Sequence, residues 1–145
     1  MIITFIGHSK LKNVSEVEVA LREVMEKYIS PGNRITFYCG GYGEFDLLCA
    51  RVVRDMKNIA NCESILVIPY LNIGKEKTDS LYDQTLYPPI ESVPPKLAIL
   101  KRNEWMIDES DIVIAFVEFS FGGAVRALEY AKRKNKTIIN LAEMC

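Results

Sequence analysis

The sequence predicts an α/β protein, a Rossmann-like three-layer sandwich with a parallel sheet of about five strands. Two observations predict it. Unbroken apolar and β-branched runs, such as residues 2–6 (IITFI) and 112–117 (IVIAFV), are typical of strands buried on both faces of a parallel sheet. Between such runs, apolar residues recur every three or four positions, as on one face of a helix. Alternating strands and helices give a parallel sheet with helices on both sides, because the crossovers are right-handed.

The first half of the chain predicts three strands and two helices. The strands are residues 2–6, 34–38 and 65–68. The first helix is expected to begin near Ser15, which forms a capping box with Glu18, and to stop at Pro31 and Gly32. The second helix follows a glycine-rich loop. The expected apolar faces are Val17, Leu21, Val24 and Tyr28 for the first helix, and Phe45, Leu48, Val52, Met56 and Ile59 for the second.

In the second half, regular patterning lapses between residues 70 and 95, where four prolines and the tyrosines Tyr70, Tyr82 and Tyr87 occur. A loop this long in a small domain is disordered, or it is a lid or a binding loop. Its aromatic residues favour a lid that covers the binding site. Helical patterning resumes at 96–107. A strand at 112–117, a helix at 124–134 and a last strand at 137–141 complete a single domain spanning residues 1–145.

Composition excludes several classes of function. The 18 basic and 19 acidic side chains leave a net charge of −1, which argues against generic nucleic-acid binding. No apolar run is long enough to span a bilayer and no signal peptide is recognisable, so we expect a cytoplasmic protein with no membrane partner. The four cysteines show no C-x-x-C pair, and His8 is the only histidine, so we expect free thiols, no metal site and no cofactor. Cys39 is the one thiol placed near a predicted site.

The carboxyl ends of the strands carry the candidate site, since ligands of such sheets bind where the strand order reverses. Three loops are expected to meet there: residues 7–10 (GHSK), 39–46 (CGGYGEFD) and 118–123 (EFSFGG). Glycines at the start of a helix allow close backbone approach and leave the first helical amides free for an anion such as phosphate. The alternative is that these glycines only permit tight turns.

Several polar side chains join these loops, each with a structural alternative. Asp46 either stabilises the start of the second helix or accepts hydrogen bonds from a ribose, and His8 either contacts ligand or packs. Arg102 and Asn103 offer donors to a phosphate or carboxylate, whereas Trp105 is expected to pack rather than stack on a base. The predicted ligand-binding residues are Gly7, His8, Ser9, Gly40, Gly41, Gly43, Asp46, Arg102, Asn103, Glu118, Gly122 and Gly123.

These motifs together resemble a known family. The stretches ITFIGHS (3–9) and FYCGGYGEFD (37–46), with the pattern RN-x-x-M-x-D-x-SD at 102–111 and GGA at 122–124, resemble the SLOG superfamily over residues 2–141. Within it, the sequence is most similar to the YpsA-like branch of small bacterial proteins. The resemblance implies a Rossmann-like domain that binds a nucleotide or nucleotide-derived ligand, such as an ADP-ribose-like molecule, and acts as a sensor or sequestering module.

The sequence departs from the enzymes of this structural group. Lonely-Guy-like phosphoribohydrolases and nucleoside deoxyribosyltransferases carry a glutamate shortly after the GG or GT turn, where this chain has Arg126 or Ala127. Glu129 lies on another face of that helix. Activity as an N-ribosyl hydrolase or transferase, the alternative function, would need a carboxylate from elsewhere: Glu118, Glu91 or Asp46. A purely structural role and a homodimer formed through the helix at 96–107 stay open.

Overall fold

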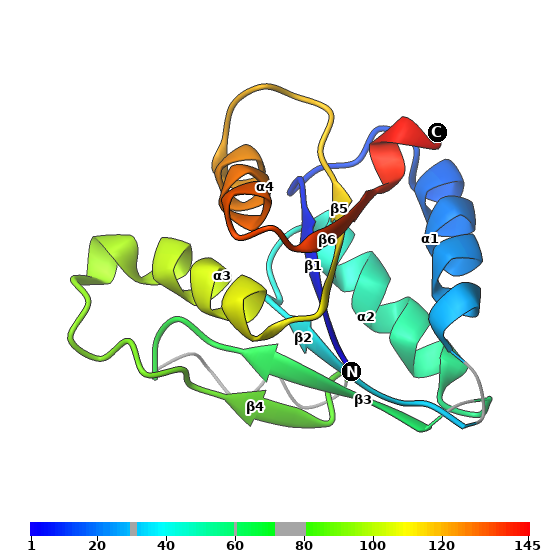
Figure 1. Cartoon of the computed structure of the whole chain (residues 1–145), viewed down its shortest axis with the longest axis horizontal. Coiled ribbons are helices and arrows are strands. Elements are labelled where there is room, and N and C mark those ends of the chain that lie inside the picture. Colours follow the sequence, from blue (N-terminus) through cyan, green and yellow to red (C-terminus); the bar gives the residue numbers. More distant parts are fainter. Residues whose placement is uncertain (30–31, 60, 72–80) are drawn as a thin grey trace.

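The computed structural model describes residues 1–29, 32–59, 61–71 and 81–145, and shows a six-stranded parallel sheet between two layers of helices (Figure 1). The strands are β1 (Ile2–Gly7), β2 (Arg34–Cys39), β3 (Asn61–Val67), β4 (Gln84–Leu86), β5 (Ile112–Phe116) and β6 (Thr137–Asn140). The helices are α1 (Val14–Tyr28), α2 (Glu44–Met56), α3 (Ala98–Glu109) and α4 (Gly123–Arg133), with single 3-10 turns η2 (Pro95–Leu97) and η3 (Leu141–Glu143). The predicted α/β Rossmann-like class is confirmed, with six strands where about five were expected.

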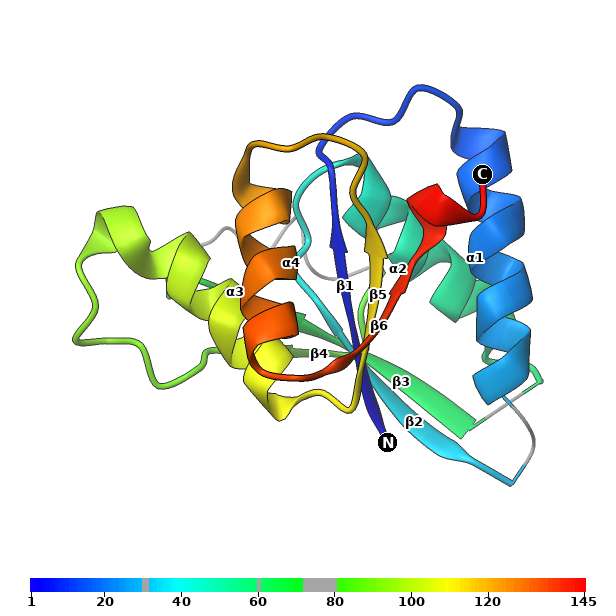
Figure 2. The ribbon, with the colours of Figure 1, turned by 45° about the horizontal axis from the view of Figure 1, so that its top comes forward.

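The strand order β4-β3-β2-β1-β5-β6 reverses direction at β1. The chain moves outward from β1 through β2 and β3 to β4, then returns to the other side of β1 to form β5 and β6. Strands β1 and β5 pair in parallel from Ile3 opposite Ile112 to Gly7 opposite Phe116. Because the crossovers run in opposite directions, α1 and α2 cover one face and α3 and α4 the other (Figures 1 and 2). The reversal therefore lies between the carboxyl ends of β1 and β5.

Both faces of the central strands are buried, which explains their continuous apolar sequence. Under α1 and α2, Phe5 stacks on Phe37 with ring centroids 5.6 Å apart, and the edge of Phe45 meets Phe5 at 6.5 Å. Under α4, the opposite face of the same strands packs Ile6 and Val113 against that helix. The fold thus fixes the ends of β1 and β5 rigidly, and the site is built on those ends.

Two details of the helices differ from the sequence-based expectation. Helix α1 begins at Val14, and the side chain of Asn13 accepts the Glu16 N–H at 3.2 Å, so the predicted capping box at Ser15 is wrong. Asparagine is among the strongest N-cap residues, and it comes two positions earlier. Helix α2 ends at Met56, which leaves Ile59 outside the helix and 65% exposed. Pro31, the expected stop signal, lies outside the described residues.

The segment between residues 70 and 95 contains more regular structure than expected. Gln84–Leu86 forms β4 at the edge of the sheet and pairs in parallel with β3. Two hydrogen bonds from Asp83 hold the start of β4 against Ser64 of β3. The Asp83 carboxylate accepts the Ser64 N–H at 2.8 Å, and the Asp83 N–H donates to the Ser64 carbonyl at 2.9 Å. Tyr82 packs against the main core. Residues 72–80, the middle of the expected lid, lie outside the described residues, and the lid stays a prediction.

Candidate functional site

A cavity of about 450 Å³ lies where the strand order reverses. The end of β1 and the loop after it form one wall, and the loop from β5 to α4 with the first turn of α4 forms another. Helix α3 and the start of α2 complete it. The lining residues are Phe5, Ile6, Gly7, His8, Ser9, Lys10, Tyr42, Asp46, Ile99, Arg102, Asn103, Met106, Phe119, Phe121, Gly122, Gly123, Ala124 and Ala127. This volume suits a small-molecule ligand.

The first glycine loop is packed against the protein's own atoms. A Cβ on Gly41, where φ is +73°, would collide with the side chain of Leu66. A Cβ on Gly43, where φ is +93°, would lie 2.7 Å from the Cα of Ser9. The Ser9 carbonyl accepts the Glu44 N–H at 2.8 Å, which occupies one of the free amides at the start of α2. These glycines therefore let the loops pack closely against one another, and anion binding by this turn stays a prediction.

The second glycine turn is open to the cavity. Gly122, with φ +107°, is the N-cap of α4, and no side chain caps this helix. A Cβ added at Gly122 or Gly123 would meet no atom within 4 Å. The first hydrogen bond of the helix runs from the Arg126 N–H to the Gly122 carbonyl, so the preceding amides have no intrahelical acceptor. The positive end of the α4 dipole faces this space and favours an anion there.

Arg102 is a buried cation in the wall of the same cavity, with 4% of its surface exposed. Its Nη1 donates to the carbonyls of Gly40 at 3.0 Å and Val67 at 2.8 Å, and its Nε donates to Asn103 Oδ1 at 2.8 Å. Its Nη2 has no hydrogen-bond acceptor among the described residues. Burial lowers its pKa, which nearby Asp46 raises, and a guanidinium remains charged at neutral pH in any case. The cation is thus fixed in orientation with donor capacity to spare.

Asp46, in the first turn of α2, lies beside this arginine. A Cβ added at Gly40 would lie 2.9 Å from Asp46 Oδ2 and 3.5 Å from Arg102 Nη2, so both groups crowd the same glycine. Burial raises the pKa of Asp46 to about 7, although Arg102 and a 3.4 Å hydrogen bond from the Tyr42 N–H oppose the shift. Asp46 therefore gains and loses its proton near neutral pH. Its charge determines how much of the arginine's field reaches a ligand.

His8 both lines the cavity and holds the loop between β5 and α4. Its Nε2 accepts the N–H groups of Glu118 at 2.9 Å and Phe119 at 3.5 Å, so the neutral ring carries its proton on Nδ1. Burial lowers its pKa, with Glu118 opposing, which favours this neutral form. The ring also packs against Phe119 with centroids 4.8 Å apart. The ring therefore packs within the protein and also lines the cavity, and its contact with a ligand stays a prediction.

Eight of the twelve predicted ligand-binding residues line the cavity: Gly7, His8, Ser9, Asp46, Arg102, Asn103, Gly122 and Gly123. The other four, Gly40, Gly41, Gly43 and Glu118, do not, and neither does Glu91. Packing also explains why position 7 is a glycine, because a Cβ there would collide with the ring of Phe45. Trp105 stacks on Tyr38 at 5.3 Å, away from the cavity. That any of these residues binds a ligand remains a prediction.

Sequence reasoning missed the side chains at the mouth of the cavity. Tyr42, Phe119 and Phe121 are 78%, 44% and 75% exposed, and Lys10 lies with them. The two phenylalanines of EFSFGG precede its glycines. The signal was present, because aromatic residues in a polar and glycine-rich loop are seldom there for core packing.

Metal ligation has no support in the part of the chain that the structure describes, where no group of three or more His, Cys, Asp or Glu side chains could hold an ion. The cysteines Cys39, Cys49, Cys62 and Cys145 are free, and Cys39 is buried in the core rather than in the cavity. Within the described residues, none of the helices has the length and apolar character to cross a membrane.

Comparison with known proteins gives matches by structure only. Neither protein-family models nor curated protein sequences match the chain. DNA processing protein A from Streptococcus pneumoniae matches with a TM-score of 0.67 and 17% identity over 94% of this chain and 48% of that one. DNA processing protein A from Helicobacter pylori, described for its single-stranded DNA binding mode, matches with a TM-score of 0.60 and 15% identity over 95% and 63%. The Moco carrier protein of Chlamydomonas rheinhardtii matches with a TM-score of 0.56 and 15% identity over 97% and 75%.

These similarities show a shared Rossmann-like fold. At 15–17% identity they show the fold alone, and membership of the SLOG superfamily and of its YpsA-like branch stays a prediction. The chain spans 63% and 48% of the two DNA processing proteins, so the activities of those longer chains are not thereby its own.

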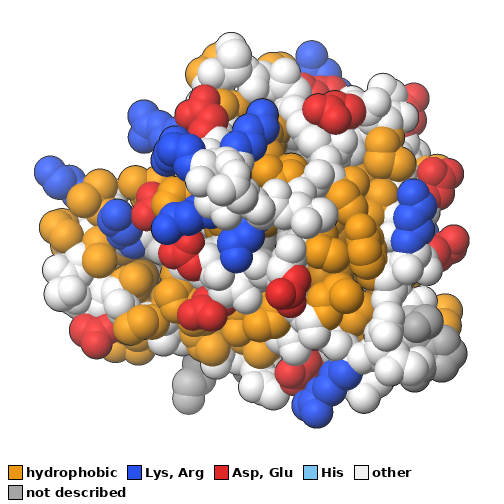
Figure 3. Space-filling model, viewed as in Figure 1, with side chains coloured by type: hydrophobic (Ala, Val, Ile, Leu, Met, Phe, Trp, Pro, Cys, Tyr) orange, Lys and Arg blue, Asp and Glu red, His pale blue; other side chains and the backbone are white. Residues whose placement is uncertain are grey.

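One sequence-based exclusion is wrong. The prediction of no generic nucleic-acid binding does not hold, since a protein of the same fold binds single-stranded DNA. The physical error was to use net charge, which sums over the whole surface and hides local clusters. Lys132, Arg133 and Lys134 are consecutive and exposed at the end of α4, and Figure 3 shows Lys and Arg side chains around this part of the molecule with acidic ones among them.

Proposed function

We propose that the cavity binds a phosphorylated small molecule, a nucleotide or a nucleotide-derived molecule such as an ADP-ribose-like compound, as a sensor or sequestering module. The observation that carries this proposal is the presence of two anion-attracting features in one cavity. The uncapped start of α4 opens into it, and the buried guanidinium of Arg102 lines its wall. A phosphate with its oxygens toward the α4 amides satisfies donors that are otherwise left to water.

The charge balance of the cavity favours a dianion over a neutral sugar or base alone. Arg102 keeps its charge, and Asp46 offsets that charge only when it is ionised. A bound phosphate raises the pKa of Asp46 further, because a second negative charge nearby disfavours ionisation. Above neutral pH, Asp46 is therefore expected to take up a proton when the ligand binds. The affinity for the phosphorylated ligand should then fall as the pH rises through about 7.

Substitution at the first residue of α4 gives a sharp test. Gly123→Pro removes one outward amide while proline remains compatible with the first helical position. Gly123→Ala keeps the amide, and its Cβ enters open space. In calorimetry with AMP, ADP-ribose and ribose 5-phosphate, we expect Gly123→Pro to weaken binding of the best ligand roughly tenfold or more, the worth of a hydrogen bond to a charged group. Gly123→Ala should bind within about threefold of the wild type.

Two results would contradict the proposal. One is that no member of the panel binds the wild type more tightly than about millimolar. The other is equal binding by Gly123→Pro and Gly123→Ala when both have wild-type unfolding midpoints. Arg102→Lys adds a second check, because lysine keeps the charge but cannot make the bonds to both Gly40 and Val67 in the same geometry.

Binding of single-stranded DNA is a second candidate function, and exposed aromatic residues at the cavity mouth favour it. Proteins that bind single strands combine basic side chains with aromatic platforms on which bases stack. Here Tyr42, Phe119 and Phe121 are exposed beside Lys10, and Lys12 Nζ lies 5.7 Å from the Phe119 ring centroid. Fluorescence anisotropy of a labelled oligonucleotide, measured over a series of salt concentrations, tests this function. We expect the affinity to fall as the salt concentration rises, and no binding at low salt would exclude it.

Catalysis at this cavity would depend on Asp46. Of the three carboxylates considered from the sequence, Asp46 lines the cavity, whereas Glu118 and Glu91 are exposed and do not. An N-ribosyl hydrolase would use its charge to stabilise an oxocarbenium-like transition state. Release of free base from a nucleoside monophosphate by the wild type but not by Asp46→Asn would support this alternative. A homodimer through α3 also stays a proposal, and light scattering tests it.

A further inference from the structure

The loop between β5 and α4 presents two stacked phenylalanine rings beside the proposed phosphate position. The ring centroids of Phe119 and Phe121 are 6.0 Å apart and their planes differ by 18°. Both rings line the cavity, and Phe121 directly precedes Gly122, the N-cap of α4. An exposed aromatic surface therefore continues directly into the anion-attracting end of a helix.

Contacts with His8 and Lys12 hold the Phe119 ring in position. The N–H of Phe119 and that of its neighbour Glu118 both donate to His8 Nε2, and the imidazole ring packs against Phe119 with centroids 4.8 Å apart. On another side of the Phe119 ring lies Lys12 Nζ, 5.7 Å from the centroid. Phe121, 75% exposed, is left with an uncovered face. Single exposed apolar residues are common in soluble proteins, but stacked aromatic rings at the mouth of a cavity are typical of a ligand surface.

We propose that Phe119 and Phe121 form a stacking platform for the base of a 5′-phosphorylated nucleotide, whose phosphate lies at the start of α4. The proposal rests on the proposed function and extends it from phosphorylated ligands in general to those that carry a base. Continuity with the anion-attracting cavity identifies the occupant, because a base linked to that phosphate must lie near the loop that leads into the helix. The nucleotide is either free or the 5′ end of a single strand, and the two share this chemistry.

Comparison of AMP with ribose 5-phosphate isolates the contribution of the base. Both probes carry the phosphate, and only AMP carries a base. We expect the wild type to bind AMP at least about tenfold more tightly, since stacking of a base on aromatic side chains contributes on this scale. In the double variant Phe119→Leu/Phe121→Leu the ratio of the two affinities should fall to near one. Phe121→Tyr, which keeps a ring, should retain most of the ratio.

The matched control is Ile59→Ala, which shortens a similarly exposed apolar side chain away from the cavity. Its affinity ratio should equal that of the wild type. Because Phe119 contacts His8, the single variant Phe121→Leu is measured as well, and thermal unfolding midpoints establish that each variant is folded. A partial loss of the ratio in this single variant supports the platform independently of Phe119.

The outcomes separate this proposal from the proposed function. Equal binding of ribose 5-phosphate and AMP by the wild type overturns the platform and leaves the phosphate site standing. Failure of both to bind overturns both. A double variant that loses affinity for both probes equally, or that changes only self-association in light scattering, also overturns the platform. A 5′-phosphorylated oligonucleotide and its 5′-hydroxyl form then identify the source: tighter, phosphate-dependent binding of the oligonucleotide than of AMP assigns the site to strand ends.

Discussion

At the scale of single residues, Asp46 shows how a fold can place a costly group where a ligand would need it. A carboxylate at the start of a helix is ordinarily stabilised by the helix dipole, and its pKa falls. Here burial dominates and raises the pKa to about 7, in spite of Arg102 nearby. Groups with shifted pKa values are concentrated at functional sites, which makes Asp46 a candidate for a role there.

Removing the charge of Asp46 is expected to stabilise the protein above neutral pH. The pKa is 3.8 in the unfolded chain and about 7 in the folded protein. The stability that the proton provides is present at low pH and is lost as the pH rises through about 7. We expect Asp46→Asn to raise the free energy of unfolding by about 2 kcal/mol at about pH 8, less than the full shift implies because Asp46 is partly exposed.

Urea unfolding of both proteins over a pH series measures this effect. The difference between Asp46→Asn and the wild type should shrink as the pH falls below 7 and vanish near the unfolded pKa. A constant difference across the series would mean that Asp46 has the same pKa in the folded and the unfolded protein. Cys62→Ala, at a half-buried thiol away from the cavity, serves as a control without this pH dependence below neutral pH.

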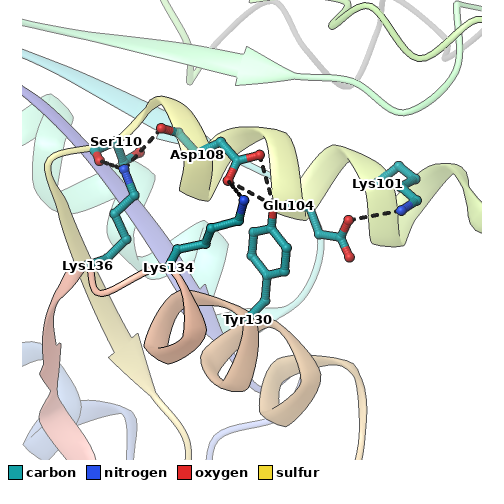
Figure 4. Close-up of polar contacts among 7 residues, drawn as sticks. All are labelled: Lys101, Glu104, Asp108, Ser110, Tyr130, Lys134 and Lys136. Carbon is teal, nitrogen blue, oxygen red and sulfur yellow. Dashed lines mark hydrogen bonds and ion pairs between the residues drawn. The ribbon is translucent and has the colours of Figure 1, made fainter.

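At the scale of elements, a polar cluster sets the position of α4 against α3 (Figure 4). Lys136 Nζ donates to the carbonyls of Asp108 at 3.0 Å and Ser110 at 2.9 Å, which satisfies acceptors at the end of α3. Tyr130, on α4, donates its hydroxyl to the Asp108 carboxylate at 2.8 Å. These contacts fix the helix whose other end opens into the cavity.

Two neighbouring lysines in this cluster are expected to differ in their effect on stability. Lys136→Met leaves two helix-end carbonyls without a charged donor and should lower the free energy of unfolding by roughly 1–2 kcal/mol. Lys134 makes a 3.9 Å ion pair with Asp108, with both side chains well exposed, and its Nζ lies 5.5 Å from the centroid of the Tyr130 ring. Lys134→Met should therefore change stability by less than about 0.5 kcal/mol. Thermal unfolding of the two variants side by side checks this, and equal effects would contradict the assignment.

The elements also show what the sequence can and cannot predict. Buried strands and amphipathic helices carry periodic patterns, so β1, β5 and the helices were predictable to within a few residues. Strand β4 was missed because QTL is short, partly exposed and defined only by its pairing with β3. The sequence pointed to the glycines of both loops, but it did not show that Gly41 packs against the protein whereas Gly122 faces open space. Whether a glycine faces Leu66 or open space depends on a neighbour far away in sequence.

For the whole molecule, the strand order brings the site together. β1 pairs with β2 on one side and β5 on the other, so the reversal of strand order falls at a strand enclosed within the sheet. Residues from 5 to 127 meet there. The sequence predicted this edge from the α/β pattern alone, because the rule for such sheets is topological. The aromatic residues of the loop between β5 and α4 are visible in the sequence, but their position at the mouth of the cavity depends on the conformation of that loop.

The same strand order predicts how stability is distributed across the sheet. Amides of β1 are enclosed by strands on both sides, whereas β4 has three residues and, among the residues that the structure describes, pairs only with β3. We expect native-state hydrogen exchange to give β1 and β5 amides the free energy of global unfolding, and β4 amides a value lower by at least about 2 kcal/mol. Low denaturant should accelerate exchange at β1 and leave β4 nearly unchanged, because local opening exposes little surface. Equal protection and equal denaturant dependence at β1 and β4 would mean that the edge strand unfolds only with the whole sheet.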